Sequence, residues 1–443
     1  MKRQFLSAVA ALALMGCTQP AADAPSDVAT PADAAAVESA PPVVRAPGDD
    51  ALRASITMDY TDNLQALYEH FHANPELSLM EVETAARLAA ELRALGYEVT
   101  EGVGGTGLVA VLPNGEGPTV MMRADMDALT VTGIDRRGLE SHVMHACAHD
   151  THMTALVGTA RQMMERRDDW SGTLVLIGQP AEEIGLGAGM MIEDGLFERF
   201  PLPDYNLSFH TFSGIPAGHI TFAPGYAMAN VDSVDISVHG RGGHGAYPHA
   251  TKDPVYLSAQ IIVALQSLVS RELSPLDPGV ITVGAIHAGT KHNIISDGAH
   301  LQLTVRSYTD EVREHLLTGI ERVAHAQAAS YGLTPEEYPE VEVEMPYTPA
   351  MYNDPALTAR AVSAMRARFG SSFVTEAEPV MGGEDFAQYH RTEAAIPSFM
   401  FWVGGTTQER LDDYAARGVA APSNHSPLFA PDDPQTSITM AIE

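Results

Sequence analysis

The chain has 443 residues, of which 45% are hydrophobic, and it carries a formal net charge of −31. This length allows two or three domains with substantial cores. A surface this acidic repels nucleic acid and anionic lipid headgroups, so neither is expected as a partner of the folded part.

The N-terminus has the pattern of an export signal. Two basic residues precede an apolar run, 5–15, that is too short to span a bilayer as a helix. The run leads to Cys17 in the sequence LMGC, which resembles the lipobox of bacterial lipoproteins. We expect residues 1–17 to be a lipoprotein signal peptide and Cys17 to be lipidated. By the same resemblance, Thr18 favours anchoring to the periplasmic side of the outer membrane. An ordinary secretory signal with an incidental cysteine is the alternative.

Residues 18–54 are rich in Ala and Pro and poor in large apolar residues, which predicts a disordered tether. With Cys17 lipidated, Cys147 is the only other cysteine and has no intramolecular disulfide partner. A lone thiol in an oxidising compartment is a liability unless it is buried or ligated. This favours a metal ligand at Cys147.

The folded part is expected to begin near Ile56, with a helix at 81–95 and another at 154–164. Three apolar, strand-like runs cover residues 119–124, 173–177 and 206–209. Strands alternating with helices are typical of an α/β sheet buried on both faces, which binds ligands at the carboxyl ends of its strands. Residues able to bind metals follow these runs: Asp125 and Asp127, Glu182 and Glu183, and His210.

From residue 229 to 339 the pattern changes. Strand-like runs at 231–238, 280–286 and 301–305 are accompanied by helical stretches at 254–268 and 310–331. We interpret this segment as an inserted α+β domain of about a hundred residues, a size that can hold its own core. The surrounding segments, 55–228 and 340–443, would then form the catalytic domain.

A candidate set of metal ligands consists of Cys147, His149, Glu183, His210 and His425. Thiolate and imidazole ligands suit zinc, cobalt, nickel or manganese. Glu182 and Glu183 suit a division of labour in which one carboxylate binds metal and its neighbour is a general base. Each of these signals is weak alone. Cys-x-His pairs occur by chance, and a single His is usually a surface or core residue. Adjacent glutamates are often only a solvated pair.

Four long motifs occur in order along the chain: MHACAHD at 144–150, QPAEE at 179–183, GRGGHGAYPH at 240–249 and HSP at 425–427. Further segments at 72–78, 123–129 and 383–386 belong to the same pattern. Together they resemble a family of metallopeptidase-like amidohydrolases that includes aminoacylases, hippurate hydrolases and auxin–amino acid conjugate hydrolases. The resemblance runs from about Ile56 to near the C-terminus.

The resemblance implies an α/β fold. A zinc-peptidase-like catalytic domain, with a mixed sheet flanked by helices, would carry an inserted ferredoxin-like lid that also forms a homodimer. Two divalent metal ions would be held by Cys147, His149, Glu183, His210 and His425, with Cys147 as the bridging ligand. Glu182 would be the general base. His244 would reach the partner subunit's substrate and stabilise the oxyanion, and Asn293 and Arg306 would bind substrate.

The expected activity is metal-dependent hydrolysis of N-acyl or N-aroyl amino acids to a carboxylic acid and a free amino acid. Metal coordination lowers the pKa of bound water to about 7, and Glu182 would transfer the water proton to the leaving nitrogen. A dipeptidase or aminopeptidase on the same scaffold is the nearest alternative. A catalytically silent, lipid-anchored binding protein is the alternative from another class.

Several residue roles remain open at this level. Asp127 is expected either to hold His149 from behind or to cap a strand end. Arg306 is expected to pair with a substrate carboxylate or to form a structural salt bridge. The glycines around His244 favour either a close approach to substrate or a hairpin turn. Three further histidines, His142, His145 and His152, are not expected to be ligands.

One departure from the family pattern concerns the loop that carries the thiol. The family usually has glycine where Ala148 stands. If this position has a positive φ, alanine costs about 1 kcal/mol there, or shifts the loop slightly.

Overall fold

The computed structural model describes residues 49–135, 140 and 143–443. The predicted signal peptide with Cys17, and residues 18–48 of the predicted tether, lie outside this range. The tether boundary predicted at residue 54 is wrong, because α1 (Asp49–Asp59) is already helical before it. Within the described ranges, no helix combines the length and the apolar composition needed to cross a membrane.

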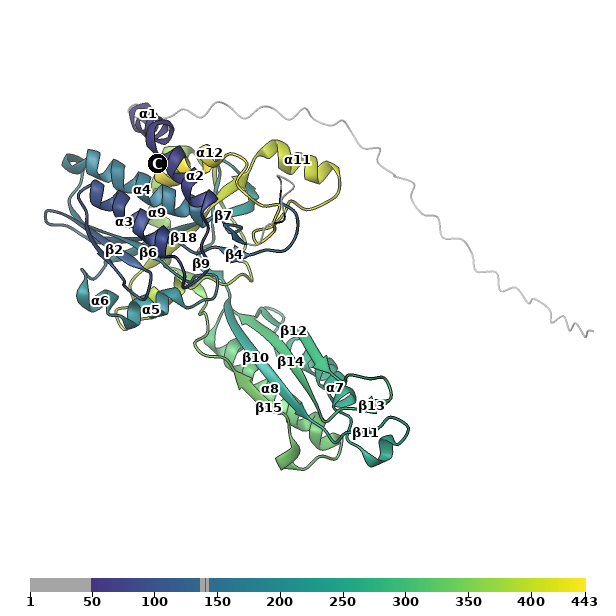
Figure 1. Ribbon diagram of the computed structural model, residues 1–443. Coiled ribbons are helices and arrows are strands. Elements are labelled where there is room, and N and C mark those ends of the chain that lie inside the picture. Colours follow the sequence, from purple (N-terminus) through teal and green to yellow (C-terminus); the bar gives the residue numbers. More distant parts are fainter. Residues whose placement is uncertain (1–48, 136–139, 141–142) are drawn as a thin grey trace, which may run out of the picture. The chain divides into compact units, whose positions relative to one another are not determined.

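The larger domain is built on a mixed sheet of eight strands (Figure 1). In spatial order the strands are β1 (Glu98–Glu101), β2 (Leu108–Asn114), β6 (Gly172–Gln179), β3 (Thr119–Asp125), β7 (Tyr205–Pro216), β18 (Ser398–Thr406), β8 (Ile220–Phe222) and β17 (Val374–Glu376). The central strands β6, β3, β7 and β18 are mutually parallel, while β2 and β8 pair with them in the antiparallel sense.

Alternate side chains of the central strands bury both faces of this sheet. On β2, Leu108 and Leu112 belong to one hydrophobic core and Val109 to another. On β6, Leu176 and Ile177 divide between the two cores in the same way. Burial on both faces explains why these strands read as continuous apolar runs in the sequence.

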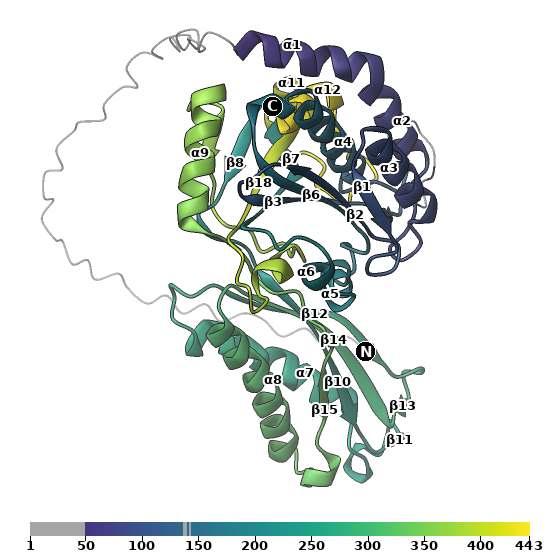
Figure 2. The ribbon, with the colours of Figure 1, turned by 90° about the vertical axis from the view of Figure 1, so that its left-hand side faces the viewer.

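Helices supply the remainder of both cores (Figure 2). Those on the first core are α2 (Gln65–Ala73), α3 (Val82–Ala94), α4 (His149–Glu165) and α12 (Pro434–Ile442). Helix α9 (Pro355–Phe369) lies on the same face as these helices, in a neighbouring core that α12 also joins and that shares Phe209 with the first core. Those on the opposite side are α5 (Gly187–Glu193), α6 (Leu196–Arg199) and α10 (Ala387–His390), while α11 (Gln408–Ala416) buries no residue. Helix α4 begins earlier than the predicted 154–164, because the polar residues of its first turn are buried at the site and do not form an apolar stripe.

The inserted domain is a four-stranded antiparallel sheet with two helices. Its spatial order is β12 (Gly279–Ala288), β14 (Gly298–Ser307), β10 (Asn230–His239) and β15 (Glu340–Val343). The helices α7 (Pro254–Ser267) and α8 (Asp310–Ser330) pack on this sheet around a separate core. The chain order β10-α7-β12-β14-α8-β15 is that of a ferredoxin-like fold, as predicted.

The predicted domain boundary at residue 339 is wrong. Strand β15 pairs with β10, with Val343 opposite Val234, so residues 340–343 complete the sheet of the inserted domain. The sequence placed them with the catalytic domain because a four-residue strand of alternating Glu and Val carries no signal for its partner.

Short elements complete the described chain. Two-stranded pairs are formed by β4 (Leu129–Thr130) with β5 (Val143–Met144), by β9 (Gly225–Met228) with β16 (Met351–Asn353), and by β11 (Gly243–His244) with β13 (Ile294–Ile295). Short 3-10 or π segments are Tyr60–Leu64, Arg167–Asp169, Pro248–Ala250, Leu268–Glu272 and Pro335–Glu337.

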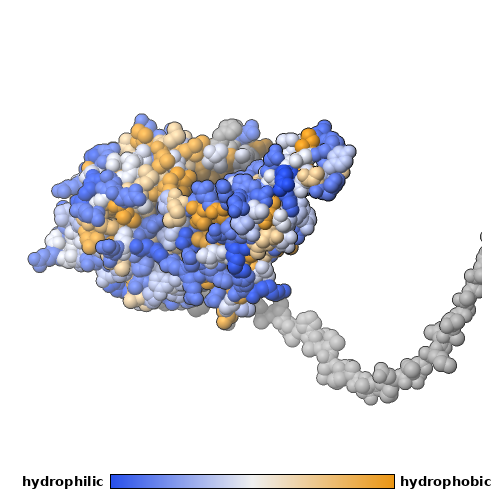
Figure 3. Space-filling model, turned by 90° about the horizontal axis from the view of Figure 1, so that it is seen from below, coloured by the Kyte–Doolittle hydropathy of each residue, from blue (hydrophilic) through white to orange (hydrophobic). Residues whose placement is uncertain are grey.

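The surface shown in Figure 3 is largely hydrophilic and is interrupted by smaller groups of hydrophobic residues. Among the exposed hydrophobic side chains are two of the inserted domain, Val263 and Leu276, which are 72% and 89% exposed. They add nothing to the core of their own domain and are available to a partner.

The parallel strands β3, β6 and β7 bring their carboxyl ends to one edge of the sheet. In register, Asp125 pairs with Gln179 and Arg123 pairs with Ser208, which places His210 level with Asp125. His210 lies inside β7, since this strand continues to Pro216 and does not end before His210 as predicted. The residues predicted to form a site therefore converge.

Candidate metal centre

The five predicted ligands lie together at this edge. Cys147 Sγ is 3.3 Å from His210 Nε2 and 3.3 Å from His425 Nε2. Glu183 approaches His425 Nε2 to 3.3 Å through Oε2 and His149 Nε2 to 3.8 Å through Oε1. The ligand atoms form two compact groups, Cys147–His149–His210 and Cys147–Glu183–His425. Cys147 belongs to both groups and would therefore be shared if each group held an ion.

The thiol is presented by a tight turn between β5 and α4. Ala148 has φ = 66° and ψ = 30°, a left-handed conformation, and α4 begins at the next residue. The turn sends Cys147 and His149 toward the same point although they are only two residues apart. The positive φ considered from the sequence for Ala148 is therefore present, and a residue with a Cβ occupies a position that glycine adopts at lower cost.

Two of the imidazoles are oriented by backbone carbonyls. His149 Nδ1 lies 2.7 Å from the carbonyl oxygen of Asp127, and His210 Nδ1 lies 2.8 Å from that of Thr211. A carbonyl oxygen only accepts hydrogen bonds, so each ring donates its Nδ1–H and keeps the Nε2 lone pair free. This is the usual arrangement behind histidines that bind metal through Nε2.

Asp127 lies beside His149, in agreement with the first of the two roles left open by the sequence. Its Oδ1 lies 3.3 Å from His149 Nδ1, beside the carbonyl contact. Its Oδ2 accepts hydrogen bonds from Ser78 Oγ at 2.6 Å and from the Glu183 backbone N–H at 3.0 Å. The Asp127 carboxylate thus lies against the His149 ring and fixes the backbone of Glu183, two of the candidate ligands.

His425 reaches the site from a loop far along the chain. Its backbone N–H donates to the Ala146 carbonyl at 2.9 Å. Its neighbour Asn424 donates through Nδ2 to Thr211 O at 2.9 Å and accepts from Ser213 N–H at 3.0 Å. His425 is itself left-handed, with φ = 70°. The loop is therefore held by hydrogen bonds to the thiol turn and to β7.

The donor set fits divalent cations. It combines one thiol, three imidazoles and a carboxylate, which suit zinc, manganese, cobalt or nickel. Two of its buried atoms, His149 Nε2 and Glu183 Oε1, have no hydrogen-bond partner in the protein. Buried polar atoms are rarely left unpaired, and a cation placed among these atoms would satisfy both.

The pKa values of this cluster are strongly shifted. Burial raises the pKa of the Cys147 thiol. Burial, with the neighbouring Glu384 and Glu183 carboxylates, raises the pKa of Glu182 well above its usual range. Burial is also the main cause that raises the pKa of Glu183 to about 7, and it lowers the pKa of His210. The protein alone solvates charge poorly here, so a cation would bind by displacing protons from these groups.

The cluster opens into a cavity of about 810 Å³. Cys147, Glu182, Glu183, His210 and His425 line it together with Arg306 of the inserted domain. Apolar walls come from side chains that include Phe212, Met228, Val380 and Trp402. The cavity is large enough for an organic molecule of moderate size.

The predicted substrate-binding residues separate into two groups. Arg306 lines the cavity, whereas His244 and Asn293 do not. His244 pairs with Ile294 between the short strands β11 and β13, and the Gly245 N–H donates to the Asn293 carbonyl at 2.9 Å. His244 and Asn293 therefore lie near each other, exposed, on the inserted domain. The glycines beside His244 take part in this hairpin-like pairing.

Arg306 makes no ion pair within the described residues. It donates to the Met381 carbonyl at 2.8 Å and to Thr304 Oγ1 at 3.3 Å. Burial lowers its pKa. The structural salt bridge considered from the sequence is absent, and the cation is left for a ligand.

The structure describes two of the histidines set aside in the sequence, and one of them, His152, lies within ligand distance of Asp125 and His149. His152 donates Nδ1–H to Asp125 Oδ1 at 2.6 Å and accepts the Thr211 N–H at Nε2, so both of its nitrogens are used. His145 is buried, with neither nitrogen hydrogen-bonded, and burial lowers its pKa to about 4. His142 lies outside the described residues.

Sequence reasoning missed a buried charge cluster behind Glu182. Arg123 pairs with Asp125 at 2.7 Å, with Glu384 at 2.8 Å and with Asp385 at 3.2 Å, and all four side chains are fully buried. The sequence indicated Asp125 as a residue able to bind metal, and indicated Arg123, Glu384 and Asp385 only as parts of the family pattern. The available signal was an arginine inside an apolar strand, since a buried cation requires acids nearby.

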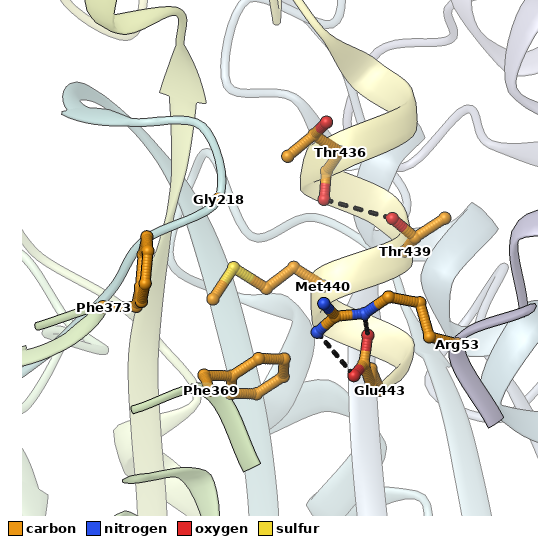
Figure 4. A pocket seen from close by; sticks show the side chains of 8 residues that line it. All are labelled: Arg53, Gly218, Phe369, Phe373, Thr436, Thr439, Met440 and Glu443. Atoms are coloured by element: carbon orange, nitrogen blue, oxygen red, sulfur yellow. Dashed lines mark hydrogen bonds and ion pairs between the residues drawn. The ribbon is translucent and has the colours of Figure 1, made fainter. Parts of the chain in front are cut away.

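A second cavity, of about 280 Å³, lies beside α12 (Figure 4). Phe369, Phe373 and Met440 form apolar walls, and Arg53 donates two hydrogen bonds of 2.7 Å to Glu443. No predicted site residue lines it.

Comparison with known proteins agrees with this geometry. A family model described as "Peptidase family M20/M25/M40" matches residues 121–416. The chain is 38% identical over 369 residues to thermostable carboxypeptidase 2 of Saccharolobus solfataricus, covering 82% of this chain and 88% of that protein. It is 35% identical over 347 residues to hippurate hydrolase of Campylobacter jejuni, covering 77% of this chain and 89% of that protein.

Among solved structures, the chain is similar to a Bacillus subtilis protein described as a dinuclear metal-binding peptidase of the M20 family. The TM-score is 0.68 at 29% identity, covering 89% of this chain and 98% of that chain. This likeness confirms the predicted fold class, a mixed sheet flanked by helices with an inserted domain.

Proposed function

The chain belongs to peptidase family M20/M25/M40 and is a metal-dependent amidohydrolase, and we propose that it cleaves N-acyl or N-aroyl amino acids to a carboxylic acid and a free amino acid. One observation carries this proposal. Glu182 lies beside the five-residue ligand cluster in a cavity that also contains the unpaired cation of Arg306. Hydrolytic groups and a carboxylate-binding group thus share one space. The relative named hippurate hydrolase is named for an N-aroyl amino acid.

Cys147, His149, Glu183, His210 and His425 would hold two divalent ions of manganese, zinc, cobalt or nickel. When bound, such ions lower the pKa of water and polarise a carbonyl oxygen. Glu182 and Glu183 lie at similar distances from His149 Nε2, 3.9 and 3.8 Å, but Glu183 also approaches His425 Nε2 to 3.3 Å. Glu182 would take a proton from the attacking water and deliver it to the leaving nitrogen, because an amine leaves poorly without one.

Arg306 would orient the substrate by its free carboxylate. The guanidinium has five N–H donors, and the contacts to Met381 and Thr304 use two of them. The remaining donors can pair with a carboxylate in the planar, two-point geometry that arginine favours. The apolar walls at Phe212 and Trp402 would receive the acyl or aroyl group.

The Glu182→Gln variant tests the assignment of the base. Gln has the size of Glu but accepts no proton, so hydrolysis should fall by at least about 100-fold. Elemental analysis should still find metal at the wild-type ratio, because Glu182 is not in the ligand set. Near wild-type activity in this variant would contradict the mechanism.

A substrate panel tests the specificity. N-acetyl, N-benzoyl, N-indoleacetyl and long-chain acyl amino acids should be hydrolysed in the presence of manganese, cobalt, zinc or nickel. Dipeptides belong in the same panel, because the relative named thermostable carboxypeptidase 2 supports peptide cleavage as a second candidate function. Preference for dipeptides would select that function. No activity and no bound metal would favour a silent binding protein.

We also propose a homodimer formed through the inserted domain, in which His244 and Asn293 complete the partner subunit's site. Both are exposed and lie outside the cavity of their own chain, and the same domain exposes Val263 and Leu276. A dimer mass in light scattering is expected. Mixing Glu182→Gln with His244→Ala subunits should restore activity if the site is shared between chains.

The lipid anchor at Cys17 and the location at the periplasmic side of the outer membrane are likewise proposals. They rest on the LMGC sequence that ends the apolar run. Metabolic labelling with palmitate should mark the wild type and not Cys17→Ser. Equal recovery of both proteins in the soluble fraction would contradict the anchor.

A further inference from the structure

We propose that Glu81 is a positioning residue for the turn that carries Glu182 and Glu183, acting through the backbone N–H of Ala181. The proposal rests on the function proposed above for Glu182 and adds a residue that none of the metal-site motifs contains. Glu81 lies on the segment before α3, and it is separated from Ala181 by 100 residues of sequence.

The contacts of the Glu81 side chain are unusual for a glutamate. It is fully buried. Its Oε1 accepts hydrogen bonds from the backbone N–H of Leu79 at 3.0 Å and of Ala181 at 2.9 Å. Its Oε2 accepts the Thr106 hydroxyl at 2.6 Å. Three donors from three separate segments meet on one carboxyl group, which is how a buried acid is satisfied without an ion pair.

Capping of its own helix does not explain this burial. Glu81 stands at the N-cap of α3, yet its side chain makes no capping hydrogen bond. The N-terminus of α3 is capped by Glu76, whose carboxylate accepts hydrogen bonds from the N–H groups of Thr84 at 2.8 Å and Glu83 at 3.3 Å. The Glu81 carboxyl is therefore free to face the Ala181 turn.

Both N–H groups that donate to Glu81 Oε1 belong to residues with a strained backbone. Leu79 has φ = 66° and Ala181 has φ = 52°, and neither is glycine. A left-handed conformation costs a non-glycine residue about 1–2 kcal/mol, so it persists only where its surroundings enforce it. The hydrogen bond from Glu81 is one such restraint on the residue immediately before Glu182.

Glu182 is consequently fixed from both sides. Glu81 holds the N–H of Ala181, and Asp127 holds the N–H of Glu183 at 3.0 Å. Ser78 ties the two restraints together, since it belongs to the Glu81 segment and donates to Asp127 at 2.6 Å. The 72–78 motif noted in the sequence thus acquires a physical role next to the turn that bears the base and one ligand.

The test compares Glu81→Met, which removes both acceptors at similar length, with Glu81→Gln, which keeps an oxygen for the two N–H groups. Thr106→Val is the control, because it removes a hydrogen bond to the same carboxyl without touching the turn. We expect Glu81→Met to lower kcat about 10- to 100-fold with KM within about twofold, the size of effect that a displacement near 1 Å produces. Glu81→Gln should recover most of the loss, and Thr106→Val should stay near wild type.

Manganese binding, measured without substrate, supplies a second readout. Displacing Glu183 with the turn should weaken manganese binding in Glu81→Met about 10-fold, again with recovery in Glu81→Gln. If the wild type hydrolyses none of the proposed substrates, the proposed function fails while this measurement still decides the role of Glu81.

Three results would overturn the positioning role. One is a lower unfolding temperature in Glu81→Met with unchanged kcat and manganese affinity, which indicates a merely structural contact. Another is equal loss in Glu81→Gln and Glu81→Met. If Glu81→Met does not fold, Glu81→Asp is tested in its place, because it shortens the side chain by one methylene and withdraws the carboxyl. The third result is a folded Glu81→Asp variant with unchanged kcat and unchanged manganese affinity.

Discussion

At the scale of single residues, backbone strain gathers where the chemistry is expected. Ala148 follows Cys147, Ala181 precedes Glu182, the proposed base, and His425 is a proposed ligand; all three have positive φ without being glycine. Such residues persist only when hydrogen bonds and packing enforce them. Here the restraints are the Ala146 carbonyl on His425 and the Glu81 carboxyl on Ala181. The positive φ values therefore indicate loops whose backbone conformation is imposed by contacts with other parts of the protein.

Ala148→Gly should leave the free energy of unfolding unchanged or raise it by up to about 1 kcal/mol. Glycine adopts φ = 66° without a steric cost, and this gain offsets the lost methyl group and the greater entropy of the unfolded chain. Ala90→Gly, in the exposed face of α3, is the matched control and should lose about 1 kcal/mol. Urea unfolding measures both. A loss at Ala148 as large as at Ala90 would contradict the argument.

At the scale of elements, the site is assembled by loops that tie strands together. The loop carrying His425 is bound to β7 through Asn424, which contacts Thr211 and Ser213. The same loop meets the thiol turn through Ala146. Because β7 also carries His210, the positions of His210 and His425, the two imidazoles beside Cys147, both depend on this strand.

Asn424→Ala should weaken manganese binding about 10-fold or more, because groups that orient metal ligands contribute 10- to 100-fold to affinity. The variant loses the two hydrogen bonds that tie the His425 loop to β7, together with the 3.8 Å contact of Asn424 Nδ2 with Cys147 Sγ. Asn63→Ala, which removes a partly buried hydrogen bond from the exposed Asn63 to Asp59, provides the control. Calorimetric titration with manganese decides, and wild-type affinity in Asn424→Ala would show that the loop needs no such anchor.

At the scale of the whole molecule, the described chain holds separate hydrophobic cores. The inserted domain has its own, built from β10, β12 and β14 with α7 and α8. Its first and last strands are neighbours, since β10 pairs with β15. A segment with its own core and adjacent ends can be inserted without disturbing the host sheet.

Residues 229–345 should therefore fold alone and unfold cooperatively, as measured by circular dichroism. Residues 229–339, which stop before β15, should be less stable or should aggregate, because one edge of β10 is then unpaired. Equal stability of the two fragments would mean that β15 pairs with the inserted domain but does not contribute to its stability.

The sequence by itself determined the fold class, the positions of the central strands, and the metal-ligand candidates that the structure brings together. The strands follow from local patterns, because apolar runs mark buried strands and strand ends collect ligands in α/β sheets. The finer fold class and the roles of the candidate ligands were implied by the family resemblance of the motifs. Ala148 could even be singled out as a strained position, because its chemistry differs from the glycine expected there.

Only the tertiary structure decided which distant groups support those ligands. Glu81, Asn424 and the Arg123 cluster act through partners that are far away in sequence, and no periodicity encodes such pairs. The edge position of β15 was decided in the same way, since strand pairing depends on where the chain returns. The candidate ligands can thus be found in local sequence motifs, whereas the geometry that orients each of them depends on non-local hydrogen bonds.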